Sequence, residues 1–171
     1  MIINSIKIKN FQTYFGDVEF EFDKPSSKKN VTLIGGLNGA GKTSFFSSIV
    51  LGLFGKNAQG IIFERSTGES INDSYESYLN EVFSNEAKKV NDIEMEISIS
   101  ITHEGNDIKI ARKWWFDNNI DEILEIYTEQ DGMVAPLEIP KEDVERNEYY
   151  EAYIQSIIPS QVGRFFFFDG E

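Results

Sequence analysis

The chain has 171 residues, enough for one domain with a hydrophobic core. Forty per cent of the residues are apolar and 26 per cent are charged, which is typical of a globular protein and excludes an intrinsically disordered one. The absence of cysteine and the single histidine exclude a disulfide framework and a thiolate or multi-histidine metal site, so any bound metal must be a hard, oxygen-liganded cation. The net charge of -13 argues against a nucleic-acid surface spread over the whole chain, although a local basic patch is compatible with it.

The sequence carries no membrane signal. Residues 1–7 lack the apolar core of a signal peptide, and no uninterrupted apolar stretch is long enough to span a bilayer. We therefore expect a cytoplasmic protein with no membrane partner.

The first third of the chain alternates between strand and helix patterns. Residues 6–9 and 18–22 alternate apolar and charged side chains with period two, which predicts an antiparallel pair with a turn at Gly16-Asp17. Residues 31–34 form a short β-prone run that ends in glycines. Residues 44–54 then predict a helix ended by Gly55, with one apolar face made of Phe45, Phe46, Ile49, Val50, Leu53 and Phe54.

The remaining elements follow the same reasoning. A second helix is predicted from Asp73, with Glu76 as its capping-box partner, and its buried side chains are expected to be Tyr75, Tyr78, Leu79, Val82 and Phe83. Period-two alternation returns over about residues 92–128 and predicts a three-stranded antiparallel meander. After Pro140 a further helix is expected, stopped by Pro159, with one side formed by Tyr149, Ala152, Tyr153 and Ile157.

The glycine-rich segment at residues 36–43 carries the chemistry. It matches the phosphate-loop pattern G-x-x-x-x-G-K-[ST], between a predicted strand and a predicted helix. Glycines let the backbone bend tightly and approach phosphate oxygens, and the loop ends at a helix amino terminus, which favours anions. Lys42 would reach the β- and γ-phosphates of ATP, and the Thr43 hydroxyl would bind Mg²⁺. The expected nucleotide-binding residues here are Gly36, Asn38, Gly39, Ala40, Gly41, Lys42, Thr43 and Ser44.

Several segments resemble a known family. Residues 6–11, the loop form Gly-x-Asn-Gly-x-Gly-Lys-Thr and the meander together resemble the SMC-like ATPases of ABC type. Residues 51–56 and the final Phe-Phe-Phe-Phe-Asp-Gly-Glu (165–171) are similar, more narrowly, to the DndD family of DNA phosphorothioation. The resemblance implies an α/β P-loop NTPase fold with a mixed sheet beside the antiparallel meander.

The resemblance also implies an organisation and a function. Residues 1–171 would be the amino-terminal lobe of a split ATPase head, with a carboxy-terminal lobe of the same protein supplying the signature and Walker B motifs. Two such heads would dimerise around MgATP and hydrolyse it. The function would be DNA sulfur modification. Its partners would be DNA and sulfur-modification proteins.

Two segments depart from the family pattern. Asp169-Gly170 stands where the family has the Gln-Gly of its Q-loop, and Asp169 has three possible roles: the Q-loop residue near Mg²⁺ and the attacking water, a Walker B-like ligand, or an incidental acid after a core strand. Gln161 is a nearby substitute for the glutamine. Gln12-Thr13 replaces the Arg-Ser that touches the phosphates in the family; both side chains can still hydrogen-bond phosphate, although a plain strand end explains them equally well.

Other functions remain open at this point. An SMC-like ATPase of DNA repair or anti-phage defence carries the same loop. A self-contained P-loop kinase would use Asp169 as its Walker B acid, and a regulatory module would hold nucleotide without turnover. A GTPase is disfavoured because the chain has no Asn-Lys-x-Asp element.

Overall fold

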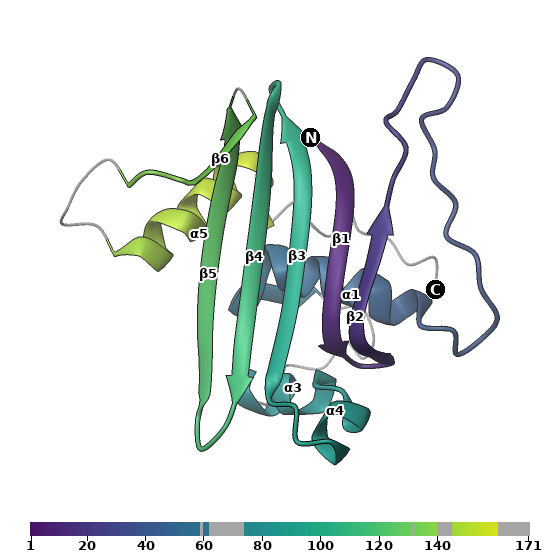
Figure 1. Ribbon diagram of the computed structural model, residues 1–171, viewed down its shortest axis with the longest axis vertical. Coiled ribbons are helices and arrows are strands. Elements are labelled where there is room, and N and C mark those ends of the chain that lie inside the picture. Colours follow the sequence, from purple (N-terminus) through teal and green to yellow (C-terminus); the bar gives the residue numbers. More distant parts are fainter. Residues whose placement is uncertain (59, 62–73, 131, 140–144, 161–171) are drawn as a thin grey trace.

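The computed structural model describes residues 1–58, 60–61, 74–130, 132–139 and 145–160. Its centre is one antiparallel sheet of six strands in the order β2-β1-β3-β4-β5-β6 (Figure 1). The strands are β1 (Ile2–Phe11), β2 (Tyr14–Glu21), β3 (Glu94–His103), β4 (Asn106–Phe116), β5 (Ile120–Gln130) and β6 (Met133–Pro136). The helices are α1 (Lys42–Phe54), the 3-10 turn η1 (Gly55–Asn57), α3 (Tyr75–Val82), α4 (Asn85–Lys89) and α5 (Arg146–Ile157).

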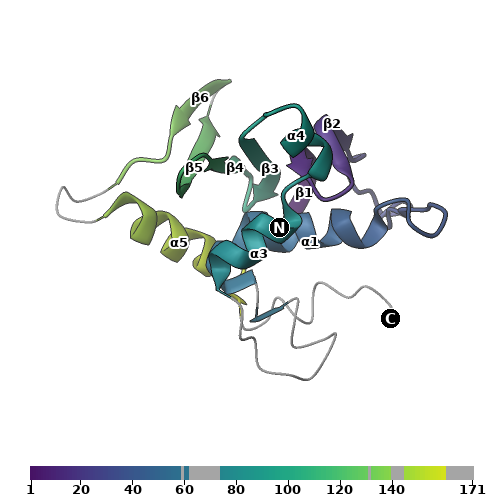
Figure 2. The same ribbon diagram turned by 90° about the horizontal axis from the view of Figure 1, so that it is seen from below.

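The helices α1, α3 and α5 lie on one face of the sheet (Figure 2). On that face the strands bury the apolar half of their alternating pattern, as Ile6 and Ile8 do in β1 and Ile97 and Ile99 do in β3. Side chains of the opposite face form cross-strand ion pairs, among them Lys7 with Asp17 at 3.0 Å and Lys113 with Glu125 at 3.4 Å. The alternation in the sequence therefore marks a sheet with one face in the core.

The meander is confirmed and is longer than predicted. β3 and β4 join through Glu104-Gly105, both at positive φ, which is the geometry of a tight two-residue hairpin turn. β5 continues into a fourth strand, β6, and β3 pairs with β1, so the meander and the amino-terminal pair share a single sheet. The predicted mixed sheet is not found among the described residues, where every strand pairing is antiparallel.

The strand predicted at residues 31–34 does not form. These residues have no regular secondary structure, and Val31 and Leu33 are 86 and 91 per cent exposed. A strand needs a neighbour for its backbone hydrogen bonds, and no strand in the described part of the chain lies beside this segment. The apolar pattern is present, but no described strand pairs with it.

The turn of the amino-terminal pair also differs from the prediction. The chain reverses at Gln12-Thr13, because Phe11 pairs with Tyr14, whereas Gly16 and Asp17 lie inside β2. Gly16 has a φ of 71° and belongs to a β-bulge in which Phe15 and Gly16 stand opposite Asn10. Glycine suits a bulge as well as a turn, so the Gly-Asp pair alone did not distinguish them.

Helix α1 is confirmed, and Gly55 ends it, donating its N–H to the Leu51 carbonyl. The predicted single apolar face is too narrow, because the helix is buried on almost all sides: Ser47 and Ser48 are buried, whereas Phe46 is only partly so. Helix and sheet approach closely at Gly52, where a Cβ would lie 2.6 Å from the Ile97 side chain.

Helices α3 and α5 require two corrections. The N-cap of α3 is Ser74, whose hydroxyl accepts the Ser77 N–H at 3.2 Å, while Asp73 lies outside the described residues. Tyr78, Leu79, Val82 and Phe83 are buried as predicted, and Tyr75 is partly buried. In α5 the buried side chains are those of Tyr150 and Ile154, followed by Ile158, whereas Ala152 is exposed.

Candidate functional site

The glycine-rich loop leads directly into α1, as its pattern predicts. Gly39 and Gly41 have φ values of 82° and 89°, which are left-handed conformations that side chains disfavour. Gly41 is the N-cap of α1, and no side chain caps the helix or places an acid in its first turn. The first N–H groups of α1 are therefore left for an external acceptor, and the helix dipole adds a positive potential at the same point.

Lys42 folds back across this loop. Its ammonium group donates to the carbonyls of Gly36 at 2.9 Å and Leu37 at 3.0 Å, so it links the end of the loop to its beginning. The Lys42 and Thr43 side chains are both exposed, which leaves the ammonium and the hydroxyl accessible to a phosphate group and its metal. The Ser44 side chain is buried, so Ser44 can offer a ligand only its backbone N–H.

The turn between β1 and β2 lies against the loop. A Cβ on Gly41 would lie 2.7 Å from the Thr13 hydroxyl and 3.2 Å from the Tyr14 hydroxyl, so only glycine fits there. The Tyr14 hydroxyl donates to the Gly41 carbonyl at 3.0 Å. Gln12 donates its N–H to the Val82 carbonyl at 2.6 Å, which ties the same turn to the end of α3.

Asn10 fixes the position of that turn. Its side chain is fully buried, its amide nitrogen donates to Asp92 at 2.9 Å and to the Glu94 carbonyl at 2.8 Å, and its oxygen accepts the N–H of Gly16 at 2.9 Å. For Asp92, burial raises the carboxyl pKa, but hydrogen bonds from the Glu94 N–H and Asn10 and the charge of Lys9 outweigh it, and the pKa is lowered. The carboxylate that Asn10 contacts is thus held in its charged form.

The sequence reasoning did not single out Asn10 or Tyr14 as parts of the site. A signal for Asn10 was present, because it follows Ile6 and Ile8 on the inward positions of β1, where a polar side chain must find buried partners. For Tyr14 no such signal exists, since its contact with the loop spans 27 residues of sequence.

The other predicted site residues are distributed as follows. Thr13 reaches the loop, and Asn38 and Ala40 lie on its exposed side. Gln161 and Asp169, the two candidates for the Q-loop role, lie outside the described residues, as does the whole segment 165–171. Within the described residues no three His, Cys, Asp or Glu side chains gather into a group that could hold a metal ion.

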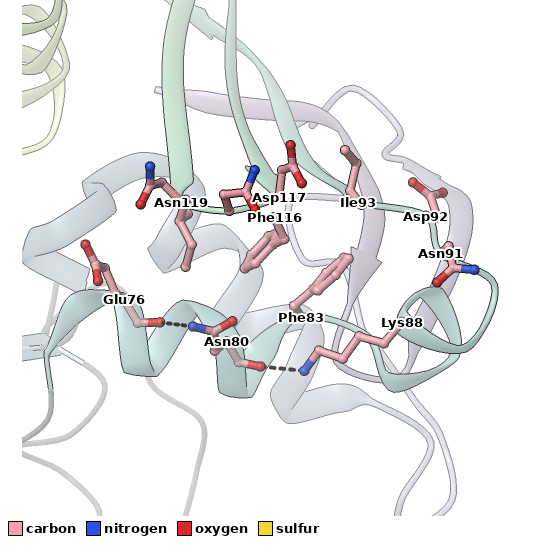
Figure 3. A pocket seen from close by; sticks show the side chains of 12 residues that line it. Glu76, Asn80, Phe83, Lys88, Asn91, Asp92, Ile93, Phe116, Asp117 and Asn119 are labelled. Atoms are coloured by element: carbon pink, nitrogen blue, oxygen red, sulfur yellow. Dashed lines mark hydrogen bonds between the residues drawn. The ribbon is translucent and has the colours of Figure 1, made fainter.

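A separate pocket of about 450 Å³ lies between α3, α4 and the β4–β5 turn (Figure 3). The rings of Phe83 and Phe116 stack within it, with centroids 4.1 Å apart, and Lys88 donates to the Asn80 carbonyl at 2.7 Å beside them. No residue of the glycine-rich loop or of the Gln12–Tyr14 turn lines this pocket. It is distinct from the phosphate-loop site.

Comparison with protein families is consistent with this geometry. The model of the AAA domain family matches residues 5–163, which is nearly the whole chain. The chain belongs to the AAA domain family. A search among curated proteins found no match.

Membership in the AAA domain family indicates a nucleotide-binding ATPase domain. It agrees with the coarse ATPase class inferred from the sequence. None of the helices in the described residues combines the length and the apolar character needed to cross a membrane.

Proposed function

We propose that this chain is the MgATP-binding lobe of an SMC-like ATPase. The observation that carries the proposal is the junction of loop and helix: Lys42 reaches across the loop while the amino terminus of α1 has no side-chain cap. Backbone donors, a helix dipole and a mobile ammonium group then converge on one exposed point. This combination binds the phosphates of a nucleoside triphosphate.

The residues present fit MgATP. The loop N–H groups would cradle the phosphates, the Lys42 ammonium would exchange its carbonyl partners for phosphate oxygens, and the Thr43 hydroxyl would bind Mg²⁺. Mg²⁺ would neutralise the charge that develops on the phosphates during transfer. Gln12 and Thr13, on the turn beside Gly41, are proposed to complete the phosphate-facing wall.

We further propose that the ATPase head is split, with a carboxy-terminal lobe covering the open side of this one. The support is the exposed segment 31–37, in which Val31, Leu33 and Leu37 are each more than 80 per cent exposed. Beside it lies an open groove of about 870 Å³ whose lining includes the apolar residues Ile3, Ile6, Phe22, Ile34, Phe45 and Ile49. A strand added next to residues 31–34 would satisfy their backbone groups and cover these side chains.

The biological role we propose is DNA sulfur modification, with a second head, DNA and sulfur-modification proteins as partners. Its support is the similarity of residues 51–56 and 165–171 to the DndD family. The net charge of -13 favours DNA engagement by another part of the assembly or by a local patch.

The test of nucleotide binding is the substitution Lys42→Ala, measured by titration calorimetry with MgATP. Removing the ammonium group should weaken binding by about 1.5 to 3 kcal/mol, the range for a hydrogen bond to a charged group. Lys56→Ala is the matched control, because Lys56 is also exposed and lies at the far end of α1, in η1. Equal affinity of folded Lys42→Ala and wild-type protein would refute the phosphate role.

A further inference from the structure

Tyr14 contacts the glycine-rich loop, although it lies outside the residues that the phosphate-loop pattern specifies. Its hydroxyl donates to the Gly41 carbonyl at 3.0 Å, and the same carbonyl accepts the first helical hydrogen bond of α1, from the Phe45 N–H at 2.8 Å. Two donors therefore hold one carbonyl at the junction between loop and helix. Burial raises the pKa of Tyr14, so the hydroxyl keeps its proton at neutral pH.

The orientation of this carbonyl has a direct consequence for the loop. The peptide unit that joins Gly41 to Lys42 is planar and trans, so its carbonyl and the Lys42 N–H point in opposite directions. Fixing the Gly41 carbonyl toward Tyr14 and the Phe45 N–H thus fixes the Lys42 N–H in the opposite direction, away from the body of α1. The flanking Gly41, at a φ of 89°, has no Cβ to restrict this peptide by itself.

The Tyr14 ring is itself held in place by packing. It meets Phe20 edge to face with ring centroids 5.8 Å apart, and Phe20 meets Phe45 of α1 in the same way at 4.7 Å. The row of three rings runs from β2 to the first turn of α1. The hydroxyl is therefore delivered to Gly41 by a side chain with little freedom to move.

We propose that Tyr14 is a positioning residue for nucleotide binding, which holds the Gly41-Lys42 peptide in the orientation that presents the Lys42 N–H to phosphate. The inference rests on the proposed function and names a residue outside the loop that orients one of its binding groups. Tyr14 itself does not touch the nucleotide in this account.

The test is Tyr14→Phe, which removes the hydroxyl and keeps the ring. We expect MgATP affinity, measured by titration calorimetry, to fall about three- to tenfold, the equivalent of one neutral hydrogen bond. Tyr150→Phe is a closely matched control, because the Tyr150 hydroxyl also donates to a backbone carbonyl at 3.0 Å, that of Leu137, far from the loop. Tyr150→Phe should leave MgATP affinity unchanged even where it lowers the unfolding temperature as much as Tyr14→Phe does.

The possible outcomes separate this inference from the proposed function. If wild-type protein binds MgATP, Lys42→Ala binds it more weakly and Tyr14→Phe matches wild type, the positioning role is overturned and the proposed function stands. Equal losses in Tyr14→Phe and Tyr150→Phe would also overturn it, because they would indicate a general loss of stability. If wild-type protein and Lys42→Ala bind MgATP equally, the proposed function fails and the positioning role with it.

Discussion

At the scale of single residues, Asn10 links the sheet to the site. Its φ of 55° is left-handed, and its buried side chain joins the bulge at Gly16 to the start of β3 through Asp92 and Glu94. The turn that follows carries Thr13 and Tyr14 to Gly41. The buried Asn10 side chain thereby sets the position of two residues that touch the loop.

Replacing Asn10 with Gly tests the side chain alone, because glycine accepts the same backbone conformation. The variant loses three hydrogen bonds, two of whose partners are backbone groups, and we expect the free energy of unfolding to fall by about 2 to 4 kcal/mol. Urea denaturation measures this. Asn91→Gly is the control, since exposed Asn91 also has a positive φ of 56°; it should change stability by only a few tenths of a kcal/mol. Equal effects of the two substitutions would contradict the role of the Asn10 side chain.

At the scale of elements, Arg112 of β4 ties the end of the phosphate-loop helix to α5. Its guanidinium is 2 per cent exposed, forms ion pairs with Glu122 of β5 and Glu151 of α5, and donates to the Gly52 carbonyl of α1 at 3.3 Å. A Cβ on Gly55 would lie 2.5 Å from this guanidinium, so the glycine that ends α1 also makes room for the charge. Burial lowers the pKa of Arg112, but the charges of Glu151 and Glu122 outweigh it, and the pKa is raised.

The substitution Glu151→Gln should show how much α5 depends on this ion pair. Arg112 would lose a carboxylate 2.8 Å away while staying buried, and we expect a loss of about 1 to 3 kcal/mol of unfolding free energy, less than for a fully buried pair because Glu151 is one third exposed. Glu125→Gln is the control. Glu125 is equally exposed and pairs with Lys113 on the sheet face opposite the helices, where we expect a loss of about 0 to 1 kcal/mol of unfolding free energy. Equal losses measured by chemical denaturation would count against a special role of Arg112.

At the scale of the whole molecule, the proposed phosphate loop would account for nucleotide binding but not for hydrolysis. Transfer of the γ-phosphate to water needs a residue that orients the attacking water and further charge around the phosphate. In the proposed function the loop and the amino terminus of α1 would bind the phosphates. The sequence has no Walker B strand followed by glutamate and no signature motif, and residues 165–169 are its one run of four apolar residues followed by an acid.

We therefore predict negligible ATP hydrolysis by the 171 residues alone, and hydrolysis that appears on adding a carboxy-terminal lobe. Activity should rise steeply with protein concentration, because the nucleotide would be enclosed between two heads. Phosphate release measured with and without that lobe tests the prediction. Robust turnover by the 171 residues alone, lost on Asp169→Asn, would instead support a self-contained enzyme.

Local patterns predicted the parts of the molecule that depend on local interactions. Period-two alternation located β1, β3, β4 and β5, and the loop pattern located the start of α1. For α5 the sequence has two overlapping apolar faces, one with Tyr149, Tyr153 and Ile157 and one with Tyr150, Ile154 and Ile158. Contacts with other elements determined which face is buried. Among them are the hydrogen bond from the Tyr150 hydroxyl to the Leu137 carbonyl and the ion pair of Glu151 with Arg112.

The sequence by itself determined the pattern on which the proposed phosphate-binding chemistry rests, because its glycines, Lys42 and Thr43 lie within eight consecutive residues that lead into a helix. Only the tertiary structure decided what surrounds the loop. The contacts of Tyr14 and Thr13 with Gly41, and of Arg112 with Gly52, span 27 residues or more and leave no periodic trace. Residues 31–34 also show the difference between a local pattern and a tertiary contact. Their pattern favours a strand, but strand formation depends on a neighbouring strand that the pattern cannot specify.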